Sequence, residues 1–155
     1  MKDLKGKKIG VPGLAGAEAL IAKRALYLNG IKVDPKDAEV EFVVFSRNDL
    51  GQALQNGVID AISVGDPAAA QMIEEYNGVV IVDTALSPEF HDEYCCGAFI
   101  AKLLAQKHPE IAAAFTRAIL KASNWVANHP EEAAKLQLDK KYVSGNLELN
   151  TRILK

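Results

Sequence analysis

The chain has 155 residues, of which 49% are hydrophobic, 25% are charged and only 6% are aromatic, and its formal net charge is -2. This length is enough for one domain, or for one complete lobe with part of another, and the composition predicts a packed globular core. Because the charge is near zero and the lysines are scattered, the chain has no basic surface for a phosphate backbone, and we expect no nucleic acid partner.

The first 90 residues alternate regularly between strand and helix patterns. Short, nearly continuous apolar runs predict strands at residues 8–12, 40–46, 59–64 and 79–82. Helical periodicity predicts helices between them, at residues 18–28, 49–56 and 68–76. This alternation is typical of a parallel sheet with right-handed crossovers. The predicted fold class is therefore α/β, with a three-layer parallel-sheet lobe.

The pattern changes after residue 90. Residues 94–101 fit one more strand, and the chain then becomes helical. Helices are predicted at residues 109–128, which are alanine-rich and amphipathic, at residues 131–136, and from Leu147 onward. The sequence thus divides into a complete α/β lobe at residues 1–90 and a crossover strand with C-terminal helices at residues 91–155.

A glycine-rich turn joins the first predicted strand to the first predicted helix. It contains Gly13, Leu14, Ala15, Gly16 and Ala17. At a helix N-terminus the unpaired backbone N–H groups and the positive end of the helix dipole favour an anion, so this turn is a candidate half of a binding site. It is neither a dinucleotide fingerprint nor a Walker P-loop, because the Gly-Lys-Ser/Thr ending is absent. From these residues alone, a tight turn without a ligand is an equally good interpretation.

A second candidate loop, Gly65-Asp66-Pro67, follows the third predicted strand. Ligands of open α/β sheets bind outside the carboxyl ends of the strands, so both loops are expected to border one cleft. The side chain of Asp66 is expected to cap the next helix, and the backbone of this loop to contact the ligand. Charged residues of the first helix, such as Glu18, are expected to be solvated.

The adjacent cysteines Cys95 and Cys96 follow His91 and raise the question of a metal site or a cysteine nucleophile. In a strand, neighbouring side chains point to opposite faces, so the two thiols do not suit one ion. Nothing in the sequence places a histidine as a base for either thiol. We therefore expect no catalytic residue, metal or cofactor. We favour one packed thiol, with the other facing the cleft or hidden.

Several phrases of the sequence occur in a recognisable order. They are Asp-Leu-Lys-Gly-Lys-Lys-Ile-Gly-Val-Pro at residues 3–12, Leu-Asn-Gly-Ile at residues 28–31, Ala-Leu-Gln-Asn-Gly-Val-Ile-Asp-Ala at residues 53–61, Val-Gly-Asp-Pro at residues 64–67, Cys-Cys-Gly at residues 95–97 and His-Pro-Glu at residues 108–110. Together they resemble the substrate-binding proteins of nitrate/sulfonate/taurine-type ABC importers, a group that includes thiamine-precursor-binding-like proteins. The resemblance extends to about residue 136.

This resemblance implies the two-lobed type II periplasmic-binding-protein fold, in which a small solute is enclosed between two lobes and is not chemically changed. It implies that the loops at Gly13 to Ala17, at Gly65 and Asp66, and near Cys95 and Cys96 face the solute. We expect an anion, such as a sulfonate or a nitrate-like ion. An ABC permease is the implied partner of the full-length protein. The parent protein is expected to be periplasmic, or extracellular and membrane-anchored, although this chain shows no signal or anchor.

The chain begins where such proteins first cross into the second lobe, so the N-terminal part of the first lobe is expected to be missing. Residues 91–155 then belong to an incomplete lobe, and the exposed face of the helix Pro109 to Asn128 is expected to pair with another copy. The alternative function is the effector-sensing domain of a transcriptional regulator with the same two-lobed fold, although no DNA-binding helix-turn-helix is visible.

Overall fold

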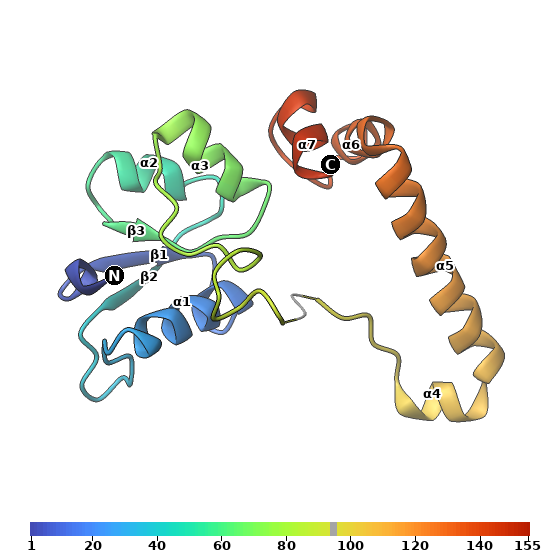
Figure 1. Ribbon diagram of the computed structural model, residues 1–155, viewed down its shortest axis with the longest axis horizontal. Coiled ribbons are helices and arrows are strands. Elements are labelled where there is room, and N and C mark those ends of the chain that lie inside the picture. Colours follow the sequence, from blue (N-terminus) through green and yellow to red (C-terminus); the bar gives the residue numbers. More distant parts are fainter. Residues whose placement is uncertain (94–95) are drawn as a thin grey trace. The chain divides into compact units, whose positions relative to one another are not determined.

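The computed structural model describes residues 1–93 and 96–155. They form two compact units, Met1–Val82 and Asp83–Lys155. The first unit contains a small parallel sheet with helices, and the second unit is helical in its described residues (Figure 1).

The sheet of the first unit is built from β1 (Lys8–Val11), β2 (Glu41–Val44) and β3 (Ala61–Ile62). The strand order is β2-β1-β3, and β1 is parallel to both neighbours, with Ile9 opposite Phe42 on one side and Ala61 on the other. These strands confirm the first, second and third predicted strands, with shorter bounds. Because all of them run in the same direction, their carboxyl ends share one edge of the sheet.

Each strand is followed by a helix: α1 (Ala17–Leu28), α2 (Leu50–Gln55) and α3 (Ala68–Tyr76), while the short helix η1 (Lys2–Leu4) precedes β1. Side chains alternate along β1, and this alternation creates two separate apolar cores. Ile9 and Val11 are buried against Leu26 of α1. A second core contains Leu50 and Ile59, and Gly10 of β1 lies against these two side chains. Helices therefore cover both faces of the sheet, with α1 on one side and α2 and α3 on the other (Figure 1).

The expected fourth strand at residues 79–82 does not form. Val79, Val80 and Ile81 follow α3 without joining the sheet, and their side chains are 86%, 55% and 53% exposed. A β-branched run favours a strand only when it fits a pleated surface that is at least half buried. Here these residues have no such surface, so the prediction from composition was wrong.

The second unit contains α4 (Lys102–Lys107), α5 (Pro109–Asn128), α6 (Pro130–Asp139) and α7 (Leu147–Ile153). The predictions for α5 and α7 are confirmed, α6 is longer than expected, and α4 was not predicted. The packed part of this unit lies between α6 and α7, where Ala134 and Leu149 are buried. Asn146 caps α7 by accepting a hydrogen bond from the N–H of Leu149 at 2.8 Å.

The strand expected at residues 94–101 is wrong for residues 96–101, which are irregular, and Phe99 among them is 89% exposed. Residues 94 and 95 lie outside the described residues. The division between the units falls after Val82, whereas the sequence pattern changes at residue 90. The segment before residue 90 makes local hydrogen bonds, such as that from the N–H of Asp83 to Ser87 Oγ at 3.0 Å.

Helix α5 contains no buried residue, although one of its faces is apolar. Ile111, Phe115 and Ile119, spaced one turn apart, are 44%, 39% and 42% exposed. The helix contacts α4 and α6, its neighbours in sequence. In the described part of the chain, no helix is both long enough and apolar enough to span a bilayer.

Candidate functional site

Three loops lie at the carboxyl edge of the sheet: residues 12–16 after β1, residues 45–49 after β2 and residues 63–67 after β3. Open α/β sheets bind their ligands at this edge, most often where the strand order reverses beside the first strand. The predicted site residues of the first unit lie here. Gly13, Leu14, Ala15, Gly16 and Ala17 lie in or just after the first of these loops, and Gly65 and Asp66 lie in the third.

In the turn after β1, the space where a side chain would lie is empty at one glycine and filled at the other. A side chain at Gly13 would meet no atom within 4 Å, whereas a Cβ at Gly16 would lie 2.9 Å from a carboxylate oxygen of Glu18. The N–H of Gly16 donates to the carbonyl of Gly13 at 3.3 Å, and the carbonyl of Gly16 accepts from Leu20 at 3.2 Å. The turn therefore leads directly into α1, and Glu18 folds back against it.

Glu18 is not the solvated charge expected from the sequence. Its carboxylate accepts a hydrogen bond from its own backbone N–H and forms an ion pair with the guanidinium of Arg47, which lies in the loop after β2. The side chain of Glu18 is only 18% exposed, compared with 52% for Arg47. The backbone hydrogen bond and the hydrogen bond from Arg47 lower the pKa of Glu18, although partial burial opposes the shift. The carboxyl group is thus ionised at neutral pH.

Ser63 connects the third loop to the same residue. Its hydroxyl donates to the backbone carbonyl of Glu18 at 2.7 Å, and its own N–H donates to the carbonyl of Gly10 in β1 at 3.0 Å. Glu18 therefore contacts the loop after β2 through its side chain and the loop after β3 through its backbone. This places all three loops in one hydrogen-bonded arrangement around the start of α1.

The side chain of Asp66 belongs to the helix that follows it. Its carboxylate accepts a hydrogen bond at 3.2 Å from the N–H of Ala70 in the first turn of α3. Asp66 therefore serves the start of this helix as expected, but from the position before the N-cap residue, which is Pro67. Gly65 has open space where a side chain would lie, so the backbone of this loop is accessible.

Cys95 lies outside the described residues, and Cys96 is exposed in the second unit. Their place in a ligand site stays a prediction. Among the described residues, no group of three His, Cys, Asp or Glu side chains is arranged to hold a metal ion. His91 instead contacts the carbonyl of Pro88 at 3.1 Å and the carboxylate of Asp92 at 3.2 Å.

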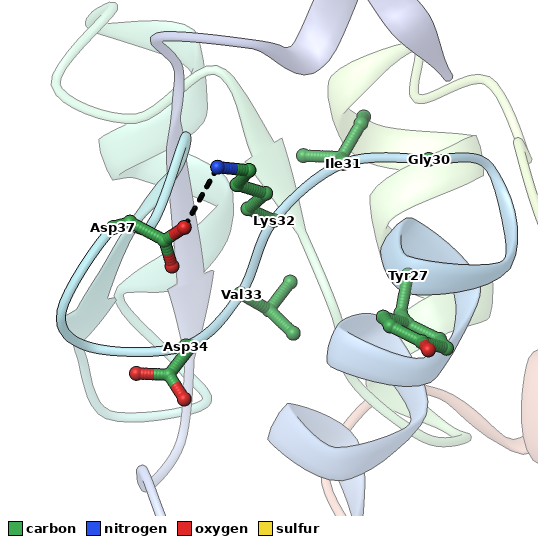
Figure 2. A pocket seen from close by; sticks show the side chains of 7 residues that line it. All are labelled: Tyr27, Gly30, Ile31, Lys32, Val33, Asp34 and Asp37. Atoms are coloured by element: carbon green, nitrogen blue, oxygen red, sulfur yellow. Dashed lines mark ion pairs between the residues drawn. The ribbon is translucent and has the colours of Figure 1, made fainter.

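An open hollow of about 540 Å³ lies elsewhere, at the C-terminal end of α1. Figure 2 shows Tyr27 projecting from the last turn of α1 beside the loop that carries Lys32 and Asp37. Lys32 and Asp37 pair with each other at 2.8 Å, and Asp34 accepts a hydrogen bond from the N–H of Lys36 at 3.0 Å. The charged groups of this hollow therefore already have partners within the protein, and we regard the carboxyl edge of the sheet as the better candidate site.

The sequence model of the NMT1-like family matches residues 1–138, a range that includes all three loops. The chain belongs to the NMT1-like family. Curated proteins of Brucella abortus, Brucella suis and Brucella melitensis, each named "putative binding protein", are 29% identical to this NMT1-like chain over 137 residues. No solved structure matches the chain significantly.

The match covers 88% of this chain but only 41% of each relative, so the chain spans about two fifths of the length of these curated proteins. Within the NMT1-like chain, sequence reasoning missed Arg47 and Ser63. Both follow strands of the sheet, and the rule that ligands bind at the carboxyl ends of strands is the signal that points to them.

Proposed function

We propose that this chain is part of the solute-binding component of an ABC importer, and that it captures a small anionic solute without catalysing a reaction. Membership of the NMT1-like family and the names of the relatives support a solute-binding role. The single observation that carries the proposal for the site is the edge where Glu18 joins the three strand-end loops. The open backbone at Gly13 and Gly65 gives a solute access to this edge.

In the whole protein we propose that a second lobe completes the site. Clamshell proteins gain affinity when both lobes contact the ligand on closure, and this chain spans 41% of its relatives. We also propose an ABC permease as partner and a periplasmic or extracellular location for the parent protein. No observation favours the alternative of a regulator's effector domain, and we do not propose it.

The test uses the chain alone and joined to the reading frame upstream of it. Thermal unfolding is measured with taurine, other sulfonates, nitrate and pyrimidine precursors. A bound solute at one hundred times its Kd should add about 2.7 kcal/mol to the free energy of unfolding. We expect stabilisation of the longer protein by one of these solutes, and weak or no stabilisation of the chain alone.

A matched pair of variants tests whether the solute binds at the carboxyl edge of the sheet. Gly13→Val fills open space in the first loop and should reduce solute binding without unfolding the protein. Lys36→Ala changes a loop at the opposite end of α1, and it should bind as the unchanged protein does. If the folded longer protein binds none of these solutes, or if Gly13→Val binds as tightly as before, the proposal is wrong.

The apolar face of α5 supports a proposal about assembly. Apolar patches that continue along a helix rarely stay in contact with water. The helix carries Glu110, Arg117 and Lys121 as its charged residues, so its net charge does not oppose self-association strongly. We propose that a second copy of the chain covers the face formed by Ile111, Phe115 and Ile119.

A further inference from the structure

The two partners of the ion pair at the carboxyl edge of the sheet differ in their exposure to solvent. The side chain of Glu18 is 18% exposed and that of Arg47 is 52% exposed. The negative charge therefore lies mostly inside, against the start of α1, and the positive charge lies mostly outside. A solute that approaches this edge meets the guanidinium first.

The N-terminus of α1 already holds a carboxylate. A Glu18 oxygen lies where it would be 2.9 Å from a Cβ at Gly16, and the carboxylate accepts the N–H of its own residue. This is the position in which an external anion would interact with the helix dipole and the free N–H groups. An anionic solute would have to displace Glu18 to bind there, and Glu18 is retained by Arg47.

Arg47 has donors to spare. A guanidinium carries five N–H donors in a planar fork, and the contact described for this side chain is the one from Nη2 to Glu18. The remaining donors suit two oxygens of one carboxylate or sulfonate, which such a fork can bind together. Because Arg47 lies in the loop after β2, these donors belong to the same edge as the open backbone at Gly13.

We propose that Arg47 binds the oxyanion group of the solute, a sulfonate or a carboxylate, and that Glu18 is the positioning residue that holds the guanidinium in place. This inference rests on the proposed function, because it assigns the charged contact of the same site. The solute's anionic group is then bound by a side chain of the second loop, and not by the backbone of the glycine-rich turn as the sequence suggested.

The test follows the Arg47 Nε–H signal by ¹⁵N NMR while ethanesulfonate is added to the longer protein described above, because the 155-residue chain alone is expected to bind weakly. Ethanesulfonamide, which has a similar shape and no charge, is the matched probe. We expect ethanesulfonate to shift the Arg47 signal and ethanesulfonamide to leave it unchanged. Arg47→Gln should weaken ethanesulfonate binding roughly 10- to 100-fold, and Arg47→Lys should fall between the two. Lys36→Gln loses the same charge at the opposite end of α1 and should bind normally.

The role of Glu18 has its own readout. In Glu18→Gln the guanidinium loses its charged partner, so the steady-state heteronuclear NOE of the Arg47 Nε–H should fall, which reports faster motion. An unchanged NOE would show that Glu18 does not position Arg47.

The outcomes separate this inference from the proposed function. Three results in the longer protein would overturn the assignment to Arg47. Ethanesulfonate could shift the amides of Gly16 and Ala17 but not Arg47, or it could shift no signal. It could also bind Arg47→Gln as tightly as the unchanged protein. The proposed function would still hold if the longer protein bound another solute of the panel. If ethanesulfonate does not bind at Arg47 and the longer protein binds no solute of the panel, the proposed function is wrong as well.

Discussion

Ser63 donates its hydroxyl to the backbone carbonyl of Glu18 at 2.7 Å, across 45 positions of sequence. The bond joins the loop after β3 to the first turn of α1, and the carboxylate of Glu18 joins the same turn to Arg47 after β2. A single residue at the start of a helix thus fixes the relative positions of three loops. We expect the shape of this edge to depend on these two contacts more than on any glycine of the turn.

Ser63→Ala should destabilise the protein by about 1 kcal/mol, because it removes a partly buried hydrogen bond and leaves the carbonyl of Glu18 without this donor. Urea unfolding followed by circular dichroism measures the change. Ser46→Ala is the control, since Ser46 makes an exposed hydrogen bond to Asp49, and it should have a smaller effect. Equal losses in the two variants would contradict a structural role for the Ser63 bond.

Gly10→Ala should destabilise the core of the first unit by about 1–3 kcal/mol through overpacking. A Cβ there would lie 2.4 Å from Cδ1 of Ile59 and 2.7 Å from Cδ2 of Leu50. Ile59→Val removes the closer atom, so the double variant should lose less stability than the sum of the two single changes. Gly13→Ala, in open space, is the control. Strict additivity of the two core changes would show that this contact does not cause the loss.

The pKa of Glu18 is lowered by hydrogen bonds from its own N–H and from Arg47. A lowered pKa in the folded state means that the unfolded chain binds more protons, so the free energy of unfolding rises with pH. This stabilisation is complete above the unfolded pKa of a glutamate, about 4.3, and is lost as the pH falls through the folded pKa. Urea unfolding between neutral and acidic pH should show a weaker pH dependence in Glu18→Gln than in the unchanged chain.

Two other carboxylates contribute with the same sign. Hydrogen bonds from Lys32 N–H and the Lys5 ammonium lower the pKa of Glu39, and hydrogen bonds from Lys8 N–H and the Lys7 ammonium lower that of Asp60. Glu18→Gln should therefore reduce the acid dependence without abolishing it. An identical pH dependence in Glu18→Gln would contradict the lowered pKa of Glu18.

The sequence predicts the sheet better than it predicts the site, and the reason is the range of the interactions. Strands such as Lys8–Val11 and helices such as Ala17–Leu28 follow from local patterns of apolar residues. The run at residues 79–82 has the same local pattern, but a strand also needs a neighbouring strand, which local sequence does not show. Helix α4 has only six residues, with one pair of leucines between two lysines, and this is too short for a helical period of apolar residues to be recognised.

The charged contact of the site depends on residues far apart in sequence. Glu18 and Arg47 are separated by 29 positions, and nothing in either local sequence indicates that they pair. The glycines of the turn were visible in the sequence, but the carboxylate that fills the space beside Gly16 was not. The contact of Asp66 was predictable because its partner, Ala70, is only four residues away, in the first turn of the helix that follows.

Phe115→Glu should convert a dimer into a monomer if a second copy covers the apolar face of α5. Phe115 lies at the centre of the stripe between Ile111 and Ile119 and is 39% exposed. A carboxylate there would be buried without a partner in the pair, and two copies would bring two such charges together. Sedimentation equilibrium at increasing protein concentration measures the change. Thr116→Glu is the control. Thr116 is the next residue along the helix, and its hydroxyl donates a hydrogen bond to the backbone carbonyl of Ala112 in the same helix. A strict monomer of the unchanged chain at high concentration would contradict the pairing. Dimers that survive Phe115→Glu would place the interface on another surface.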